Sequence, residues 1–134
     1  MIYKLEQALD QCDAKLIVAV HPWDEAVAYY TGSSEGDDGS GVGHLLSAVA
    51  DNNCKSFKTC GESGDMNQGQ AKVNIDIFRA FKQGQSLLGE GKCSEARVVK
   101  ERIEALMAVP MIQGTLRFAY YRGEIMHSTT AQAE

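Results

Sequence analysis

The sequence lacks any long hydrophobic run. No uninterrupted apolar stretch is longer than Leu16–Val20, far short of the roughly 20 residues that a membrane-spanning helix needs. The first residues also lack the basic start and the apolar segment of a secretory signal. We therefore expect neither a transmembrane segment nor a signal peptide, which leaves a cytoplasmic location open.

Clusters of basic residues are also missing. The chain has 13 Lys and Arg residues against 18 Asp and Glu residues, a net charge of -5. No group of cations is dense enough to neutralise a row of phosphates, so nucleic acid is not an expected partner. With 44% hydrophobic and 23% charged residues, the composition is typical of a folded globular domain.

The four cysteines form no Cys-x-x-Cys pair and have no histidine at the spacing of a zinc site. Cys54 and Cys60 enclose a short polar segment, which would close as a disulfide loop in an oxidising compartment. Cys12 lies on an apolar stripe and is predicted to be a core residue. The pairing of these three and Cys93 stays open.

Helical periodicity is what the sequence does contain. In the first segment, apolar residues recur at steps of three and four, which predicts a helix over about residues 2–19. Further helices are predicted from Pro22 to about Gly32, from Val42 to about Asn52, from about Val73 to Gly89, and after Ser94. Pro110 is expected to break or kink that pattern before a last helix to about Met126.

These patterns predict an all-α fold. We expect one domain over residues 1–126, a bundle of five or six helices with two long polar loops. The loops cover about residues 31–43 and 53–68, and residues 127–134 are expected to be a frayed tail. Long loops in a compact domain often carry function.

Acidic residues near the predicted second helix could offer oxygen ligands to a cation. Asp24 and Glu25 follow Trp23 and lead into the acidic glycine loop that contains Glu35. The alternative is structural: the two adjacent carboxylates favour the first turn of a helix, and Trp23 belongs to the core. The loop lacks the ligand spacing of an EF-hand.

Polar residues interrupt the apolar faces of two predicted helices. Asn74 and Asp76 lie in the central helix, and Gln113 and Arg117 are four positions apart in the last one. Inward-facing polar groups need partners. Asp76 opposite Arg117 would form a buried ion pair, of which a structural role is the more common use and a ligand clamp the alternative.

Several segments in this order resemble the low-iron-inducible periplasmic, or Fe-assimilating, proteins of algae and their bacterial relatives. They are Trp23-Asp24-Glu25, Ala28 to Ser33, Glu35-Gly36, Cys54 to Gly61, Lys72 to Asp76, Val109-Pro110 and Ile112 to Arg117. The resemblance implies a periplasmic or secreted protein of iron assimilation, with iron as the bound metal and no established reaction. It also implies metal ligands: Asp24, Glu35 and Asp76, with Tyr30 as an additional phenolate.

We therefore expect a helical binding protein rather than an enzyme. Its partner would be a metal ion or a small molecule held near Trp23, Tyr30, Asn74, Gln113 and Arg117. One alternative is a small hydrolase-like enzyme in which paired carboxylates act as acid and base. Another is a helical interaction module that docks through exposed Trp23, Tyr29 and Tyr30. The ligand and the oligomeric state, a homo-oligomer included, stay open.

Overall fold

The described residues form a bundle of five α-helices. The computed structural model describes residues 1–16, 18–32 and 45–131, with side chains described as far as Arg122. The helices are α1 (Ile2–Asp13), α2 (Val20–Thr31), α3 (Leu46–Phe57), α4 (Lys72–Gly89) and α5 (Cys93–Ala131). The described part of the chain contains no strand, so the predicted all-α class is confirmed. None of the described helices is long and apolar enough to cross a membrane.

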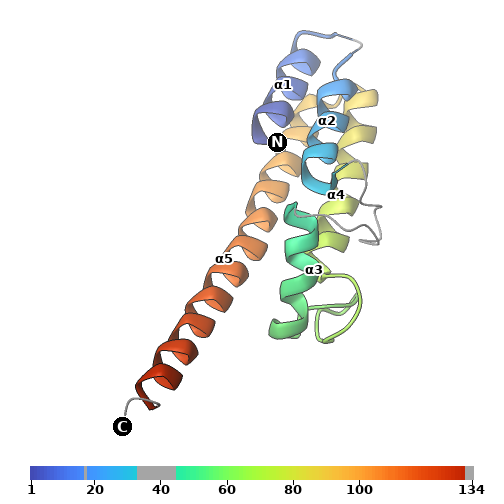
Figure 1. Ribbon diagram of the computed structural model, residues 1–134. Coiled ribbons are helices and arrows are strands. Elements are labelled where there is room, and N and C mark those ends of the chain that lie inside the picture. The colour runs from blue at the N-terminus through green and yellow to red at the C-terminus, as the bar shows by residue number, and fades with distance from the viewer. Residues whose placement is uncertain (17, 33–44, 132–134) are drawn as a thin grey trace.

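The helices are arranged around α4 and α5 (Figure 1). At one end of the molecule α1, α2 and α4 pack together with the first half of α5. α3 lies further along, packed on α4 and α5. The second half of α5 runs past α3 and projects from the bundle.

Trp23 lies in the middle of the core, between α2 and α4. Its side chain is fully buried, and its indole Nε1 donates a hydrogen bond of 3.0 Å to the carbonyl oxygen of Phe81. The Phe81 ring meets the indole nearly edge to face, at 87°. Gly84, one turn further along α4, faces the indole so closely that a Cβ there would lie 2.0 Å from Trp23 Cζ2. The core interpretation of Trp23 is therefore correct.

Two predicted boundaries in the first third of the chain are wrong. α1 ends at Asp13 rather than near residue 19. Lys15 adopts a positive φ of 57°, a backbone conformation that is incompatible with a right-handed helix. Leu16, the last residue of the apolar pattern that predicted this helix, is half exposed in the connecting segment, as is Val18. α2 begins at Val20, with Pro22 in its first turn. Backbone N–H groups in a first turn have no acceptor within the helix, so proline removes no helical hydrogen bond there. Most of the predicted loop over residues 31–43 lies outside the described residues.

Pro110 does not end a helix, which corrects the prediction of a break. α5 is one helix of 39 residues with Pro110 inside it, and it continues to Ala131, beyond the predicted end at Met126. A proline removes one backbone donor, so the carbonyl of Leu106 loses its helical partner. Pro110 is fully buried, and packing against the bundle offsets that cost.

The chain contains two disulfide bonds. Cys54 and Cys60 are bonded, closing the short loop that was one of the sequence alternatives. Cys12 is buried as predicted, but it is also bonded to Cys93, 81 positions away. This second bond joins the end of α1 to the first residue of α5, a link that no local pattern in the sequence indicates.

Candidate functional site

Three of the predicted ligand-binding residues form part of the core. Tyr30 on α2 donates a hydrogen bond of 2.6 Å to Asn74 Oδ1 on α4, and Asn74 Nδ2 donates one of 2.8 Å to the carbonyl oxygen of Ser47 on α3. Tyr30, Asn74 and Trp23 are all fully buried. They are therefore neither an open binding site nor a docking surface, and of the three aromatics expected to dock a partner only Tyr29 is exposed.

The Tyr30 hydroxyl is held in its neutral form. Burial raises its pKa well above the ordinary value for tyrosine, and the nearby Asp51 carboxylate adds to the rise. A phenolate ligand for iron is therefore disfavoured at this position. The hydroxyl instead acts as a hydrogen-bond donor that joins α2 to α4.

Tyr30→Phe tests this structural role. The change removes the donor and leaves Asn74 Oδ1 buried without it, which should reduce the free energy of unfolding by about 1–3 kcal/mol. Tyr29→Phe is the matched control, because Tyr29 is 60% exposed and should change stability by less than about 0.5 kcal/mol. Urea unfolding of both variants gives the comparison. Equal stability of the two would show that the buried hydrogen bond contributes nothing.

The predicted metal ligands are not brought together where the structure describes them. Asp24 Oδ1 accepts a hydrogen bond of 2.8 Å from Gln85, while Asp76 forms an ion pair of 2.6 Å with Lys72. Gln85 lies nine positions beyond Asp76 on α4, a rise of about 13 Å along the helix. Glu35 lies outside the described residues. Among the residues that are described, no three His, Cys, Asp or Glu side chains cluster as metal ligands would.

The expected Asp76–Arg117 ion pair is wrong. Asp76 pairs with Lys72 one turn away on its own helix, and Arg117 Nη1 donates a hydrogen bond of 3.2 Å to Asn53 Oδ1 on α3. The Arg117 guanidinium also lies over the Tyr121 ring, 5.6 Å from its centroid. A helical period identifies the face a residue occupies, but it does not identify the helix across from it.

Gln113 and Arg117 instead meet α3 and the segment that follows it. Gln113 Nε2 donates a hydrogen bond of 3.0 Å to Thr59 Oγ1, and its buried Oε1 has no partner among the described residues. Gly114 lies beside α3 as well, since a Cβ there would be at ordinary contact distance, 3.4 Å, from Asn53 Nδ2. The two polar residues predicted on the last helix therefore contribute to the α3–α5 contact.

Two grooves flank that contact. One has a volume of about 410 Å³ and the other about 280 Å³, and Arg117 and Tyr121 line both of them. We define the α3–α5 face as the apolar side chains and the arginine that line these grooves, together with the three cations within two positions of them in sequence. The groove-lining members are Val49, Phe57, Leu116, Arg117, Phe118, Tyr120 and Tyr121, and the neighbouring cations are Lys55, Lys58 and Arg122.

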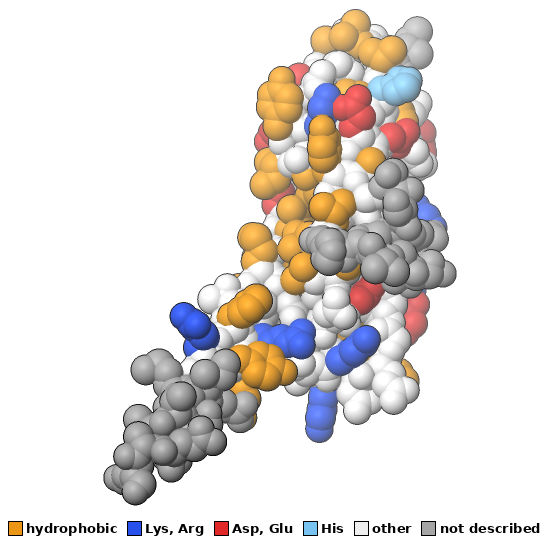
Figure 2. Space-filling view, viewed as in Figure 1, with side chains coloured by type: hydrophobic (Ala, Val, Ile, Leu, Met, Phe, Trp, Pro, Cys, Tyr) orange, Lys and Arg blue, Asp and Glu red, His pale blue; other side chains and the backbone are white. Residues whose placement is uncertain are grey.

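The apolar members of the α3–α5 face on α5 are unusually exposed. Phe118 is 75% and Leu116 54% exposed. Figure 2 shows hydrophobic side chains beside a group of Lys and Arg side chains at this end of the molecule. The signal that could have identified this surface is the spread of apolar residues around every side of the helix beyond Pro110.

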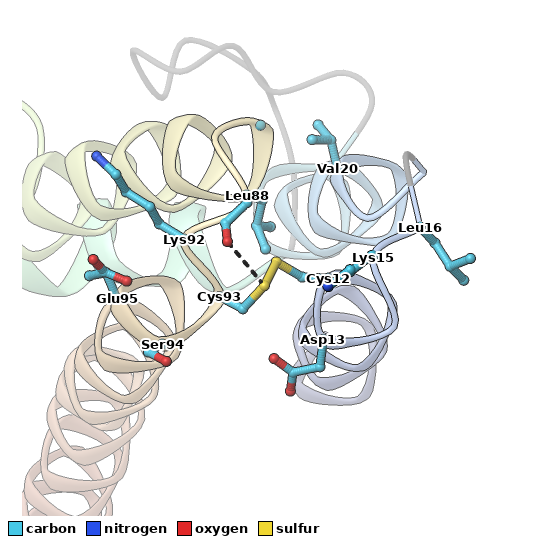
Figure 3. A pocket seen from close by; sticks show the side chains of 12 residues that line it. Cys12, Asp13, Lys15, Leu16, Val20, Leu88, Lys92, Cys93, Ser94 and Glu95 are labelled. Carbon is cyan, nitrogen blue, oxygen red and sulfur yellow. Dashed lines mark hydrogen bonds between the residues drawn. A yellow bond between two sulfur atoms is a disulfide. The ribbon is translucent and has the colours of Figure 1, made fainter.

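A cavity of about 700 Å³ is lined in part by the Cys12–Cys93 disulfide. Figure 3 shows the charged ends of Asp13, Lys92 and Glu95 pointing in different directions, away from the disulfide. Asp13 pairs with Arg97 at 2.7 Å, outside the cavity lining. The charged side chains that line this cavity do not converge on one point. It is a disulfide-linked contact between helices and a weaker candidate for a binding site than the α3–α5 face.

No protein-family model, curated protein or solved structure matches this chain. Membership of an iron-assimilation family and a periplasmic location therefore remain predictions that rest on the sequence resemblance alone.

Proposed function

We propose that this protein is a helical interaction module that docks a second, different protein chain on its α3–α5 face. The observation that carries the proposal is the exposure of apolar side chains on all sides of the projecting half of α5. Leu116 and Phe118 are two positions apart, so they lie about 200° apart around the helix. Both are more than half exposed.

A helix with apolar side chains on every side is normally surrounded by protein. The first half of α5 is amphipathic instead. Ala96, Val99 and Ile103 face the bundle and are buried, whereas Glu101 and Arg102 are exposed. Beyond Pro110, Gln113 and Arg117 contact Thr59 and Asn53, while the described large apolar side chains of this part of the helix are 47% to 75% exposed. Contiguous exposed apolar groups of this kind, bordered by polar groups, mark interaction surfaces.

The charges on the face argue against a second copy of the chain as the occupant. In a two-fold symmetric dimer the same surface meets itself. The cations Lys55, Lys58, Arg117 and Arg122 of one copy would then face the same positive group of the other, and like charges across an interface cost several kcal/mol. A different chain avoids this repulsion.

Photo-crosslinking tests the proposal. A benzoylphenylalanine at position 118, introduced in the native cells, should form a discrete adduct whose second component mass spectrometry identifies. The purified partner should then bind the wild-type protein and bind Leu116→Ser at least about tenfold more weakly, as expected for a central apolar contact. Val98→Ser is the matched control, because Val98 is 66% exposed on the same helix but outside the α3–α5 face.

Two results would contradict this proposal. Equal loss of affinity in Leu116→Ser and Val98→Ser would show that the contact is not specific to this face. Sedimentation of the wild type as a dimer, with Leu116→Ser sedimenting as a monomer, would replace the foreign partner with a second copy.

A further inference from the structure

The cations of the α3–α5 face are not paired with acidic residues in the part of the chain that the structure describes. Lys55, Lys58, Arg117 and Arg122 form no ion pair with any carboxylate that the structure describes. Most other described cations are paired. Their ion pairs are Lys4–Glu25, Lys72–Asp76, Arg79–Glu62, Lys92–Glu90, Arg97–Asp13 and Lys100–Glu6.

Among the described residues, no acidic side chain lines either groove of the face. Of the acidic residues near these cations in sequence, Asp51 Oδ1 accepts a hydrogen bond of 2.5 Å from the backbone N–H of Ala71, and Glu62 pairs with Arg79. The side chain of Glu124, two positions after Arg122, lies outside the described part of the chain. A chain with a net charge of -5 therefore presents a locally positive surface around an apolar groove. Such a field favours an anionic partner and repels a basic one.

Arg117 occupies the centre of this surface. Its side chain is half buried and lines both grooves. Asn53 Oδ1 accepts a hydrogen bond from one of its N–H groups, and the Tyr121 ring lies against the guanidinium. Asn53 is itself oriented by donating a hydrogen bond of 3.4 Å to the carbonyl oxygen of Pro110.

This arrangement holds the guanidinium in place while most of its donors have no protein acceptor among the described residues. A guanidinium has five N–H donors in a planar fork that matches a carboxylate in two parallel hydrogen bonds. Holding the side chain in position beforehand reduces the entropy lost on binding. Arg117 is therefore suited to anchor a carboxylate that enters along the groove.

We infer that the partner docks through an acidic segment with apolar side chains, one of whose Asp or Glu carboxylates binds Arg117. This inference rests on the docking function proposed above and adds the chemistry of the partner. A protein segment is favoured over an anionic membrane because the apolar groups border grooves between two helices. A lipid surface selects an amphipathic helix whose apolar groups lie on one face, whereas here they surround α5.

Two synthetic helical peptides test the inference on the full-length protein. They share the same Leu and Phe positions and differ only in having Glu or Gln on the flanking polar positions. We expect the Glu peptide to bind at least about tenfold more tightly than the Gln peptide, with the difference shrinking as salt is raised. Arg117→Gln should weaken the binding of the Glu peptide by a similar factor and leave the affinity for the Gln peptide unchanged.

Arg102→Gln is the control, because Arg102 is an exposed cation on α5 outside the face that likewise forms no ion pair with a described carboxylate. It should change either affinity by less than about twofold, as expected for a charge remote from the interface. Equal binding of the two peptides, both lost in Leu116→Ser, would overturn the acidic partner and leave the docking function standing. Binding of neither peptide, together with Arg117-dependent binding to phosphatidylglycerol vesicles, would overturn both in favour of a lipid surface.

Discussion

Gly84→Ala is expected to reduce the free energy of unfolding by about 3 kcal/mol, a large effect for a single methyl group. The new Cβ would lie 2.0 Å from Trp23 Cζ2 and 2.5 Å from Trp23 Cη2. The indole cannot move aside easily, because it is fully buried and its Nε1 is hydrogen-bonded to Phe81. The clash therefore outweighs the gain of up to about 1 kcal/mol that alanine brings to a helix.

Gly89→Ala is the matched control for this prediction. Gly89 is on the same helix and a Cβ there meets nothing within 4 Å, so the variant should be neutral or stabilised by up to about 1 kcal/mol. Chemical denaturation of both variants gives the comparison. The loss in Gly84→Ala should also shrink in a Trp23→Phe background, since the clashing ring atoms are then absent. Equal stability of the two alanine variants would show that α2 and α4 do not approach as described.

Removing the Cys12–Cys93 disulfide should cost still more. The bond closes a chain segment with a sequence separation of 81, and the double variant Cys12→Ala, Cys93→Ala should lose about 4 kcal/mol of stability. The Cys54–Cys60 bond has a separation of only 6, so its removal should cost roughly 2 kcal/mol by the same chain-entropy argument.

Urea unfolding of both double variants under oxidising conditions measures the difference. Chemical reduction of the wild type should reproduce the sum of the two losses if the bonds act independently. A larger loss from the short loop than from the long one would contradict the entropic account. In that case Cys54–Cys60 would hold native contacts that the unfolded state lacks, such as the pairing of Cys60 with Met66 and Ala71.

Local sequence patterns were sufficient where packing follows a single amphipathic face. The central helix was predicted from about Val73 to Gly89, and α4 runs from Lys72 to Gly89. Its stripe residues Val73, Ile77, Phe81 and Leu88 are all buried. The all-α class followed from the same period, because strands would have required alternation over several residues.

The sequence could not indicate which helices become neighbours. Asp76 and Arg117 each occupy a plausible inner face, yet they pair with Lys72 and Asn53 instead. The Cys12–Cys93 bond was missed for the same reason, since its two residues are brought together only by the folded chain. Contacts of this kind depend on the order and tilt of the helices, which the 3.6-residue periodicity of apolar residues does not determine.

The exposed α3–α5 face was not predicted, because apolar residues at helical spacing were assumed to face the core. Leu116 and Tyr120 fit a helical stripe, and the stripe was read as a buried face of the bundle. In the structure both lie beside α3 at the edge of a groove and remain mostly exposed. A stripe of this kind cannot by itself distinguish a core contact from a surface reserved for another chain.

The continuity of α5 through Pro110 determines how a bound partner would be held. A helix of 39 residues is about 58 Å long, and its first residue is tied to α1 by the Cys12–Cys93 disulfide. A docked partner would therefore be connected to the bundle by a stiff element with a set direction. A flexible linker would let the partner sample a sphere of positions. The helix would instead hold the partner at one distance and in one orientation. Any molecule bound to the bundle would therefore meet the partner at a high and direction-dependent effective concentration.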